Sequence, residues 1–125
     1  MFSFKELLFV GVTGGIIYGA IEVLFRGYTH WSMILTGGLC FLLFYILNFM
    51  LNINILGKCI LASFIITSFE LIIGYIVNVV HGMNVWSYAN MPFNYMGQIC
   101  LLYSGIWFFF GIPMSILAGY IRTII

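Results

Sequence analysis

Charged residues are scarce in this 125-residue chain, which has only four Lys or Arg and three Asp or Glu. A soluble domain must cover its surface with polar groups, and a chain that is 64% hydrophobic and 6% charged cannot do so. The formal net charge of +1 provides no basic surface for nucleic acid. The partners that remain are the lipid bilayer, other membrane helices and small solutes.

Sequence motifs for catalysis, nucleotide binding and metal binding are also missing. The chain has no GxxxxGK(S/T) phosphate loop, no HExxH or CxxC pair, and no Ser/His/Asp set at useful spacing. Its three cysteines, Cys40, Cys59 and Cys100, fall within apolar segments, where a thiol behaves as a small hydrophobe. We therefore expect no enzyme activity, no cofactor and no metal site.

Long apolar runs are what the chain does contain. Four of them have roughly the 20 residues that a membrane-crossing helix needs. They cover residues 7–25, 33–51, 59–80 and 99–121. The sequence thus predicts a single all-α membrane domain over residues 1–125 with four transmembrane helices. Residues 81–98, between the third and fourth helices, form its one long connection.

The positive charges near the span ends predict an orientation. Lys5, Lys58 and Arg122 share one side of the predicted bundle, whereas Arg26 stands alone on the other. Cytoplasmic ends of membrane helices carry the excess of Lys and Arg. We therefore expect both termini in the cytoplasm and the long segment 81–98 on the outer side.

The two halves of the chain have weakly similar sequences. Residues 37–42 (GGLCFL), in the second span, match residues 97–102 (GQICLL), at the start of the fourth. A tandem repeat of two-span units would have a pseudo-twofold axis along the membrane normal. Cys40 and Cys100 would then face each other across that axis. The alternative is a chance similarity between apolar segments.

Small residues recur at every fourth position on two of the spans. These residues are Gly11, Gly15 and Gly19 in the first span and Gly111, Ser115 and Gly119 in the fourth. Because small side chains allow helix backbones to approach closely, the pattern favours packing of the first span against the fourth. The alternative is that one of the two tracks is an interface of a homo-oligomer or with other membrane subunits.

Two acidic residues lie inside the predicted spans, where an ionisable group usually marks a binding site, a pathway or an ion pair. At a rise of about 1.5 Å per residue, Glu22 and Glu70 both fall in the outer half of the bilayer. Arg26, one turn after Glu22, can neutralise only one of these carboxylates. His30 and His81 flank the same boundary and can titrate near neutral pH, so we group them with Arg26 as ion-pair or gating residues.

A candidate solute site follows from these acids and the outer segment. Its predicted members are Glu22, Glu70, Trp86, Tyr88, Asn90, Asn94 and Gln98. Negative charge beside aromatic faces suits a cation or an amine-bearing solute. The sequence therefore predicts a small transporter, permease-like or solute-binding protein with an outward-facing site. The alternative is a membrane scaffold, lipid-interacting or regulatory protein that transports nothing.

The outer segment also resembles a known family. Trp86-Ser87-Tyr88 followed by residues 91–101 (MPFNYMGQICL) is similar to the W-D-Y-S … P-F-N-x-x-G-x-I-C signature of the CmpB-like ABC-transporter type IV membrane proteins. Residues 17–22 and 69–74 are similar to that family's G-W-x-x-E and E-L-I-x-G segments, but Ser87 replaces the usual Asp. The resemblance implies a small multi-span permease. We expect it in the bacterial cytoplasmic membrane, with separate subunits for any ATP-driven role.

Overall fold

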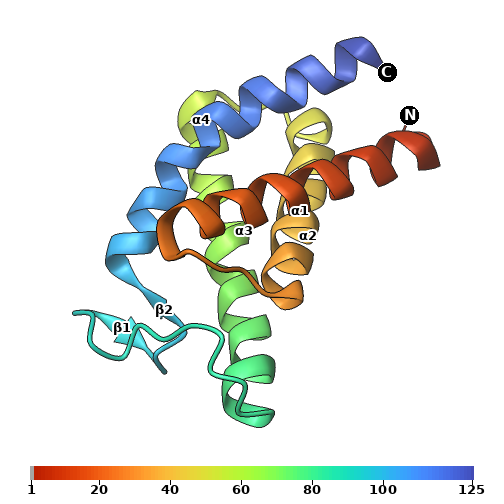
Figure 1. The fold of residues 1–125 in the computed structure, drawn as a ribbon. Coiled ribbons are helices and arrows are strands. Elements are labelled where there is room, and N and C mark those ends of the chain that lie inside the picture. The colour runs from red at the N-terminus through yellow and green to blue at the C-terminus, as the bar shows by residue number, and fades with distance from the viewer. Residues whose placement is uncertain (1) are drawn as a thin grey trace.

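Long helices account for most of the described residues (Figure 1). The computed structural model of the chain describes residues 2–125, and the side chains of all of these except Phe25 and Arg26. The helices are α1 (Phe4–Arg26), α2 (Trp31–Met50), α3 (Ile55–Gly74) and α4 (Leu101–Ile124), and a π-helical segment, η1 (Tyr75–Val80), extends α3. With η1 counted as part of α3, all four are long and apolar enough to cross a membrane. The prediction of four spans is therefore confirmed.

Polar residues define where the helices begin and end. Ser3 precedes α1 and its hydroxyl oxygen accepts a hydrogen bond from the Glu6 backbone N–H at 3.1 Å. Asn54 precedes α3 and accepts in the same way from the backbone N–H of Gly57 at 2.9 Å. Such caps satisfy N–H groups that have no partner within the helix. After α1 the chain turns at Gly27, whose φ of +81° lies in the left-handed region that favours glycine.

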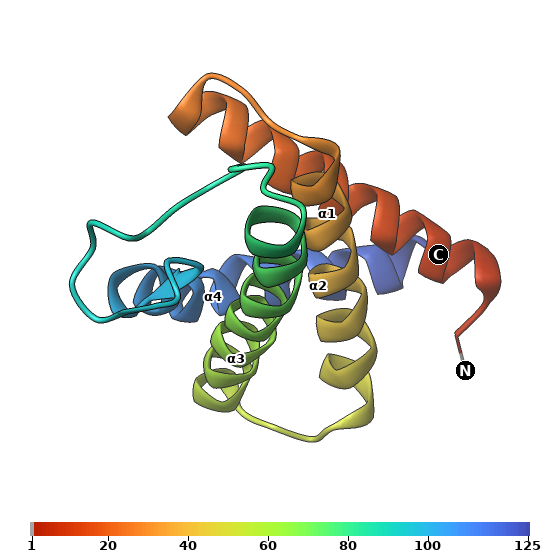
Figure 2. The same ribbon diagram turned by 90° about the horizontal axis from the view of Figure 1, so that it is seen from below.

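The helices form two pairs. α1 packs mainly against α2, α3 packs mainly against α4, and contacts between α2 and α3 join the pairs. Figure 2 shows α2 and α3 running beside each other, with α1 and α4 crossing them. Phe44, Ile66 and Trp107 are buried in the shared core. The start of α1 and the end of α4 meet at one end of the molecule, where Nη1 of Arg122 lies 2.5 Å from Oε2 of Glu6 (Figure 1).

The small residues of α1 contact α2. A Cβ atom at Gly15 would lie 2.9 Å from the carbonyl oxygen of Ile34, and one at Gly19 would lie 3.1 Å from the side chain of the same residue. A Cβ atom at Gly38 of α2 would lie 2.7 Å from the carbonyl oxygen of Gly11. The backbones of α1 and α2 therefore approach as closely as glycine allows.

In α4, the small residue Gly111 contacts α3. A Cβ atom at Gly111 would lie 2.6 Å from the Cα atom of Cys59 in α3. Ser115 is half-buried, and a Cβ atom at Gly119 would have no described atom within 4 Å outside its own helix. The predicted packing of the first span against the fourth is therefore wrong, because the glycine contacts lie within each helix pair. The alternative use as an oligomer interface stays a prediction.

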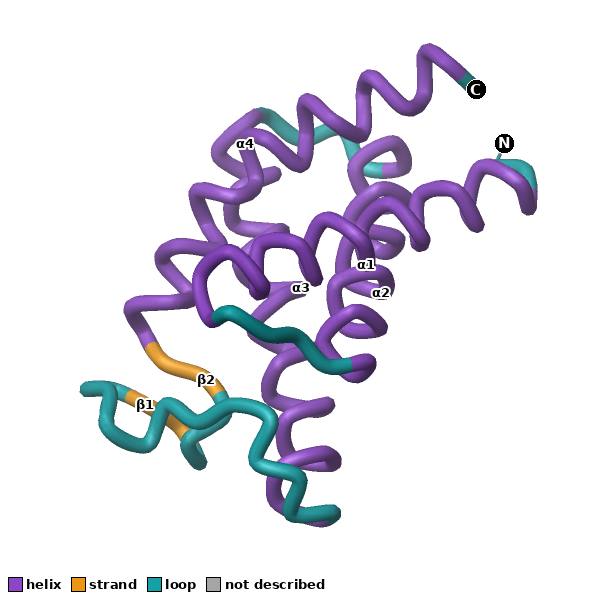
Figure 3. The backbone as a smooth tube through the Cα atoms, viewed as in Figure 1, coloured by secondary structure: helices purple, strands orange, loops and turns teal. Residues whose placement is uncertain are grey.

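The two segments aligned as a repeat have different structures. Residues 37–42 lie inside α2, whereas residues 97–102 include a turn, the strand β2 (Ile99–Cys100) and the first residues of α4. This strand pairs antiparallel with β1 (Asn94–Tyr95), as Figure 3 shows, and the fourth helix consequently begins at Leu101, two residues later than predicted. All three thiols are free, so no disulfide joins Cys40 to Cys100. The pseudo-twofold axis stays a prediction.

Large apolar side chains cover the outer faces of the helices. Leu24, Met50, Phe64 and Ile116, one from each helix, are exposed by 82%, 59%, 72% and 69%. Patches of this kind are rare on soluble monomers, whereas hydrocarbon solvates them without cost. Their distribution over four spanning-length helices is that of an integral membrane protein whose helices contact lipid. The direction of insertion, with cytoplasmic termini, stays a prediction.

Candidate solute-binding site

The Glu70 carboxylate joins three parts of the fold. Glu70 lies on α3 and is only 3% exposed. Its Oε1 atom accepts a hydrogen bond from Nε1 of Trp107 on α4 at 2.8 Å. Its Oε2 atom accepts a second one from the Tyr88 hydroxyl, in the 81–100 segment, at 3.0 Å. One side chain therefore fixes the positions of two aromatic rings from different elements.

Aromatic rings continue from this point along α4. The rings of Tyr88 and Tyr103 are stacked, with centroids 4.9 Å apart and an interplanar angle of 19°. Trp107 follows one turn later, 6.2 Å from Tyr103, and meets Phe110 edge-on at 5.1 Å. Tyr18 of α1 reaches the same tryptophan at 6.1 Å. These rings form a continuous aromatic wall that links α1, α4 and the 81–100 segment.

A cavity of about 700 Å³ lies against this wall. It is bounded by the end of α1, by residues 84–91 and by the first half of α4. The polar and aromatic residues that line it are Glu22, Tyr28, Asn84, Trp86, Ser87, Tyr88, Tyr103, Trp107 and Phe110. Glu70 is not part of the lining, although both of its hydrogen-bond donors are. The two acids predicted for the site thus have different places: Glu22 at the cavity, and Glu70 behind its aromatic wall.

The hydroxyl of Tyr88 is held as a hydrogen-bond donor. Burial, and next the nearby Glu70 carboxylate, raise the pKa of the Tyr88 hydroxyl above its ordinary value. Both effects disfavour the phenolate, because a second negative charge would have to be placed in a buried site. The hydroxyl therefore keeps its proton over the physiological pH range.

Buried amides anchor the 81–100 segment to η1. Oε1 of Gln98 accepts a hydrogen bond from Nδ2 of Asn78 at 2.8 Å, and Oδ1 of Asn78 accepts from the Val85 backbone N–H at 2.6 Å. The indole N–H of Trp86 donates to the carbonyl oxygen of Gln98 at 3.1 Å. Gly74 permits this packing, because a Cβ atom there would lie 2.7 Å from Gln98 Oε1. Gln98 is thus a supporting residue and does not line the cavity, contrary to its predicted role.

The two predicted asparagines also lie outside the cavity lining. Nδ2 of Asn94 donates to the carbonyl oxygen of Met91 at 2.8 Å, and its Oδ1 accepts from the Gly97 backbone N–H at 3.1 Å. The first bond shapes the turn before β1, and the second shapes the turn between β1 and β2. Asn90 is exposed. Of the predicted solute-binding residues, the structure brings Glu22, Trp86 and Tyr88 together at the cavity, with Glu70 directly behind them.

Neither of the two predicted gating histidines is among the described residues that line the cavity. His30 is the N-cap of α2, where its Nδ1 atom lies 2.7 Å from the Ser32 hydroxyl and 3.2 Å from the Ser32 backbone nitrogen. His81 is exposed at the end of η1. The side chain of Arg26 lies outside the described residues. The gating role of these three residues stays a prediction.

A second acidic cluster was missed by the sequence analysis. Glu6 is 4% exposed, and its Oε2 atom accepts hydrogen bonds from the Tyr45 hydroxyl and from Nη1 of Arg122, the latter at 2.5 Å. The guanidinium also lies over the Phe2 and Phe49 rings, 4.7 and 5.5 Å from their centroids. The available signal was that Glu6 and Arg122 fall on the same side of the predicted bundle. This Glu6 cluster closes the end of the molecule where the termini meet.

The fold and the cavity together define a helical integral membrane protein with a partly enclosed site that combines acidic and aromatic groups. The chain belongs to the family described as putative ABC-transporter type IV, whose family model matches residues 6–124. The family resemblance of the outer segment is thereby confirmed, and the protein is related to transporter membrane proteins. Comparison with curated proteins and with solved structures gave no match.

Proposed function

We propose that this protein binds a small organic cation in the 700 Å³ cavity and acts as a permease or solute-capture subunit. The observation that carries the proposal is the presence of an acidic side chain, Glu22, in a cavity walled by tyrosine and tryptophan rings. Ring faces attract cations, most strongly where water is excluded, and a carboxylate supplies the matching charge. Membership of a family described as putative ABC transporters supports a role in transport.

Each part of the site has a distinct role in this proposal. Glu22 provides charge at the cavity, and Trp86 and Tyr103 offer ring faces to the solute. Glu70 acts through Tyr88 and Trp107, because its two hydrogen bonds hold these rings in place before the solute arrives. A prearranged wall reduces the ordering cost of binding.

The same proposal includes a setting in the cell. The protein works in the bacterial cytoplasmic membrane, with the cavity facing outward, as a homo-oligomer or beside other membrane subunits. It binds or transports its solute and does not transform it chemically. The chain has no phosphate-binding loop, so ATP-driven transport would need a separate ATPase.

A second function, that of a membrane scaffold, is favoured by one observation. Both oxygens of Glu70 accept hydrogen bonds from groups of the protein itself, as expected of a structural carboxylate. In that case the aromatic wall would only fix the position of the 81–100 segment, and the cavity would hold no specific solute.

Binding measurements separate the two functions. The protein in lipid nanodiscs would be titrated calorimetrically with tetramethylammonium and with a neutral compound of the same shape. We expect the cation alone to bind, and Glu22→Gln to weaken it about tenfold or more, which corresponds to about 1.4 kcal/mol. Equal affinity for the cation and the neutral compound would contradict the proposal.

An aromatic pair of variants provides the matched control. Tyr103→Leu removes a ring from the cavity, whereas Tyr120→Leu removes one from an exposed position on the same helix. Cation–π contacts contribute about 0.5–2 kcal/mol, so we expect Tyr103→Leu to lower the affinity for tetramethylammonium about two- to thirtyfold. Tyr120→Leu should leave its affinity unchanged. Identical affinities in the two variants would favour the scaffold.

A further inference from the structure

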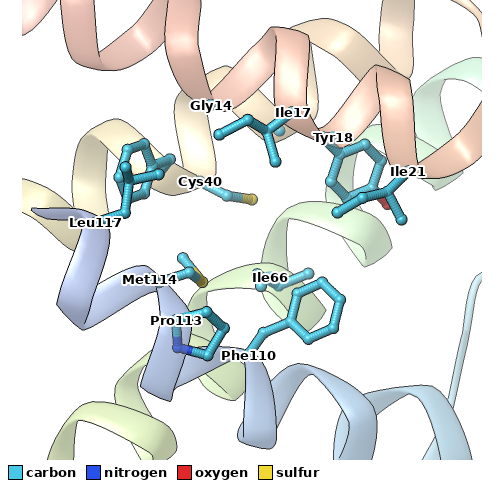
Figure 4. A pocket seen from close by; sticks show the side chains of 12 residues that line it. Gly14, Ile17, Tyr18, Ile21, Cys40, Ile66, Phe110, Pro113, Met114 and Leu117 are labelled. Atoms are coloured by element: carbon cyan, nitrogen blue, oxygen red, sulfur yellow. The ribbon is translucent and has the colours of Figure 1, made fainter.

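A second cavity, of about 200 Å³, is lined by residues of α1, α2, α3 and α4. Figure 4 shows its side chains arranged around an open space, among them Ile17 from α1, Cys40 from α2, and Met114 and Leu117 from α4. The lining is almost wholly apolar, in contrast to the acidic and aromatic lining of the larger cavity. Such a lining offers water few hydrogen-bond partners.

The two cavities follow each other along the same pair of helices. Ile21 and Phe110 line both of them. On α1 the apolar cavity is lined from Gly14 to Ile21 and the larger one begins at Ile21. On α4 the larger cavity is lined from Tyr103 to Phe110 and the apolar one from Phe110 to Leu117. The two cavities are therefore neighbours, and the side chains of Ile21 and Phe110 lie where they meet.

We infer that the two cavities form one site for an amphipathic ammonium compound, with its charged head in the larger cavity and a short alkyl chain in the apolar one. This inference rests on the proposed binding of a cation and narrows its class. Glu22 lies at the polar end of the combined site, and the side chains around Leu117 lie at its apolar end. A chain that leaves the head group meets hydrocarbon side chains as soon as it passes Ile21 and Phe110.

The volume of the apolar cavity limits the length of the chain. Apolar cavities of about 150 Å³ take up benzene, so 200 Å³ accommodates roughly six to eight carbon atoms. Burying one methylene group from water increases an affinity by up to about fourfold. The affinity should therefore rise with each added carbon and level off once the cavity is full.

The test is a series of alkyltrimethylammonium ions with chains of one to ten carbons, titrated against the protein in nanodiscs. Empty nanodiscs provide the correction for partition into lipid. Leu117→Trp fills the apolar cavity, and Ile116→Trp places the same ring on the exposed face of α4 as the matched control. Thermal unfolding of both variants shows whether either substitution disturbs the fold.

We expect the wild type and Ile116→Trp to bind longer chains more tightly, by two- to fourfold per carbon, up to about six to eight carbons. Leu117→Trp should bind tetramethylammonium normally but lose most of this increase. Two results would refute the combined site but leave the cation site standing, provided that tetramethylammonium binds. One is an affinity that does not rise with chain length, and the other is an equal rise in Leu117→Trp and Ile116→Trp. If no member of the series binds, the proposed function fails and this inference fails with it. Should Leu117→Trp be unstable, Met114→Phe, which fills the same cavity, must remove the increase.

Discussion

The role of Glu70 can be tested by comparing two substitutions that preserve its hydrogen bonds to different degrees. Glu70→Gln keeps an oxygen for the indole N–H of Trp107, and its amide can donate to the Tyr88 oxygen in place of the present bond. Glu70→Leu removes both acceptors. Both residues line the cavity, but Trp107 is buried and its indole N–H would then lack a partner, whereas the half-buried Tyr88 can turn to water.

The hydrogen bonds determine the size of the two effects. A bond to a carboxylate contributes about 1.5–3 kcal/mol, and a bond between neutral groups contributes about 0.5–1.5 kcal/mol. Weakening both bonds should therefore make Glu70→Gln less stable than the wild type by about 2 kcal/mol. Losing both should lower the free energy of unfolding of Glu70→Leu by about 3–6 kcal/mol.

The free energy of unfolding would be measured by titrating mixed micelles with a denaturing detergent while following the helical circular dichroism. Ile72→Ala, at an exposed position of the same helix, is the control and should stay within about 0.5 kcal/mol of the wild type. Affinity for tetramethylammonium should fall in the same order as stability, because Glu70 acts on the cavity through its wall. Equal stability of the Gln and Leu variants would refute this account of the hydrogen bonds. Complete loss of binding in Glu70→Gln at full stability would place Glu70 in direct contact with the solute.

Three further predictions concern contacts that hold the fold together. In the same detergent titration, Gly38→Ala should lower the free energy of unfolding by about 1–3 kcal/mol, because the new methyl group meets the α1 backbone. The control Gly119→Ala places its methyl group in open space and should be neutral or slightly stabilising. Glu6→Gln and Arg122→Gln should each lower the free energy of unfolding, and the double variant should lose less than the sum of the two single losses. A double-mutant cycle measures this difference, and strict additivity would contradict the ion pair. Gln98→Leu should speed hydrogen exchange at the backbone amides of residues 84–88, because it removes the buried amide bond to η1; unchanged exchange would disprove that anchoring role.

The sequence predicted the helices well because membrane spans are determined by composition and length. Backbone N–H and C=O groups in lipid must form their hydrogen bonds within the segment, so an apolar run of sufficient length is enough to predict a spanning helix. The sequence was less informative about which helices pack together. Gly15 and Gly111 each indicate a face that allows close approach, but the facing surface in another helix contains Ile34 or Cys59, which have no distinctive pattern.

The site was predictable to the extent that it depends on charge inside a span. Glu22 and Glu70 were both recognised, but the separation of one at the cavity from the other behind Tyr88 depends on side-chain positions. The anchoring bonds of Gln98 were not predicted, because an amide that binds a ligand and one that anchors a loop look the same in a sequence. Glu6 was missed since its partners Tyr45 and Arg122 come from distant helices, and no local pattern records such contacts.

The pair formed by Glu6 and Arg122 has a consequence for the biosynthesis of the protein. The two residues are separated by 116 positions, so the acid enters the bilayer long before the ribosome has made its cationic partner. Until α4 is inserted, the carboxylate must stay near the lipid headgroups or pick up a proton. The ion pair therefore forms only after α4 has been made, and it joins α1 to α4 only in chains that have been translated as far as Arg122.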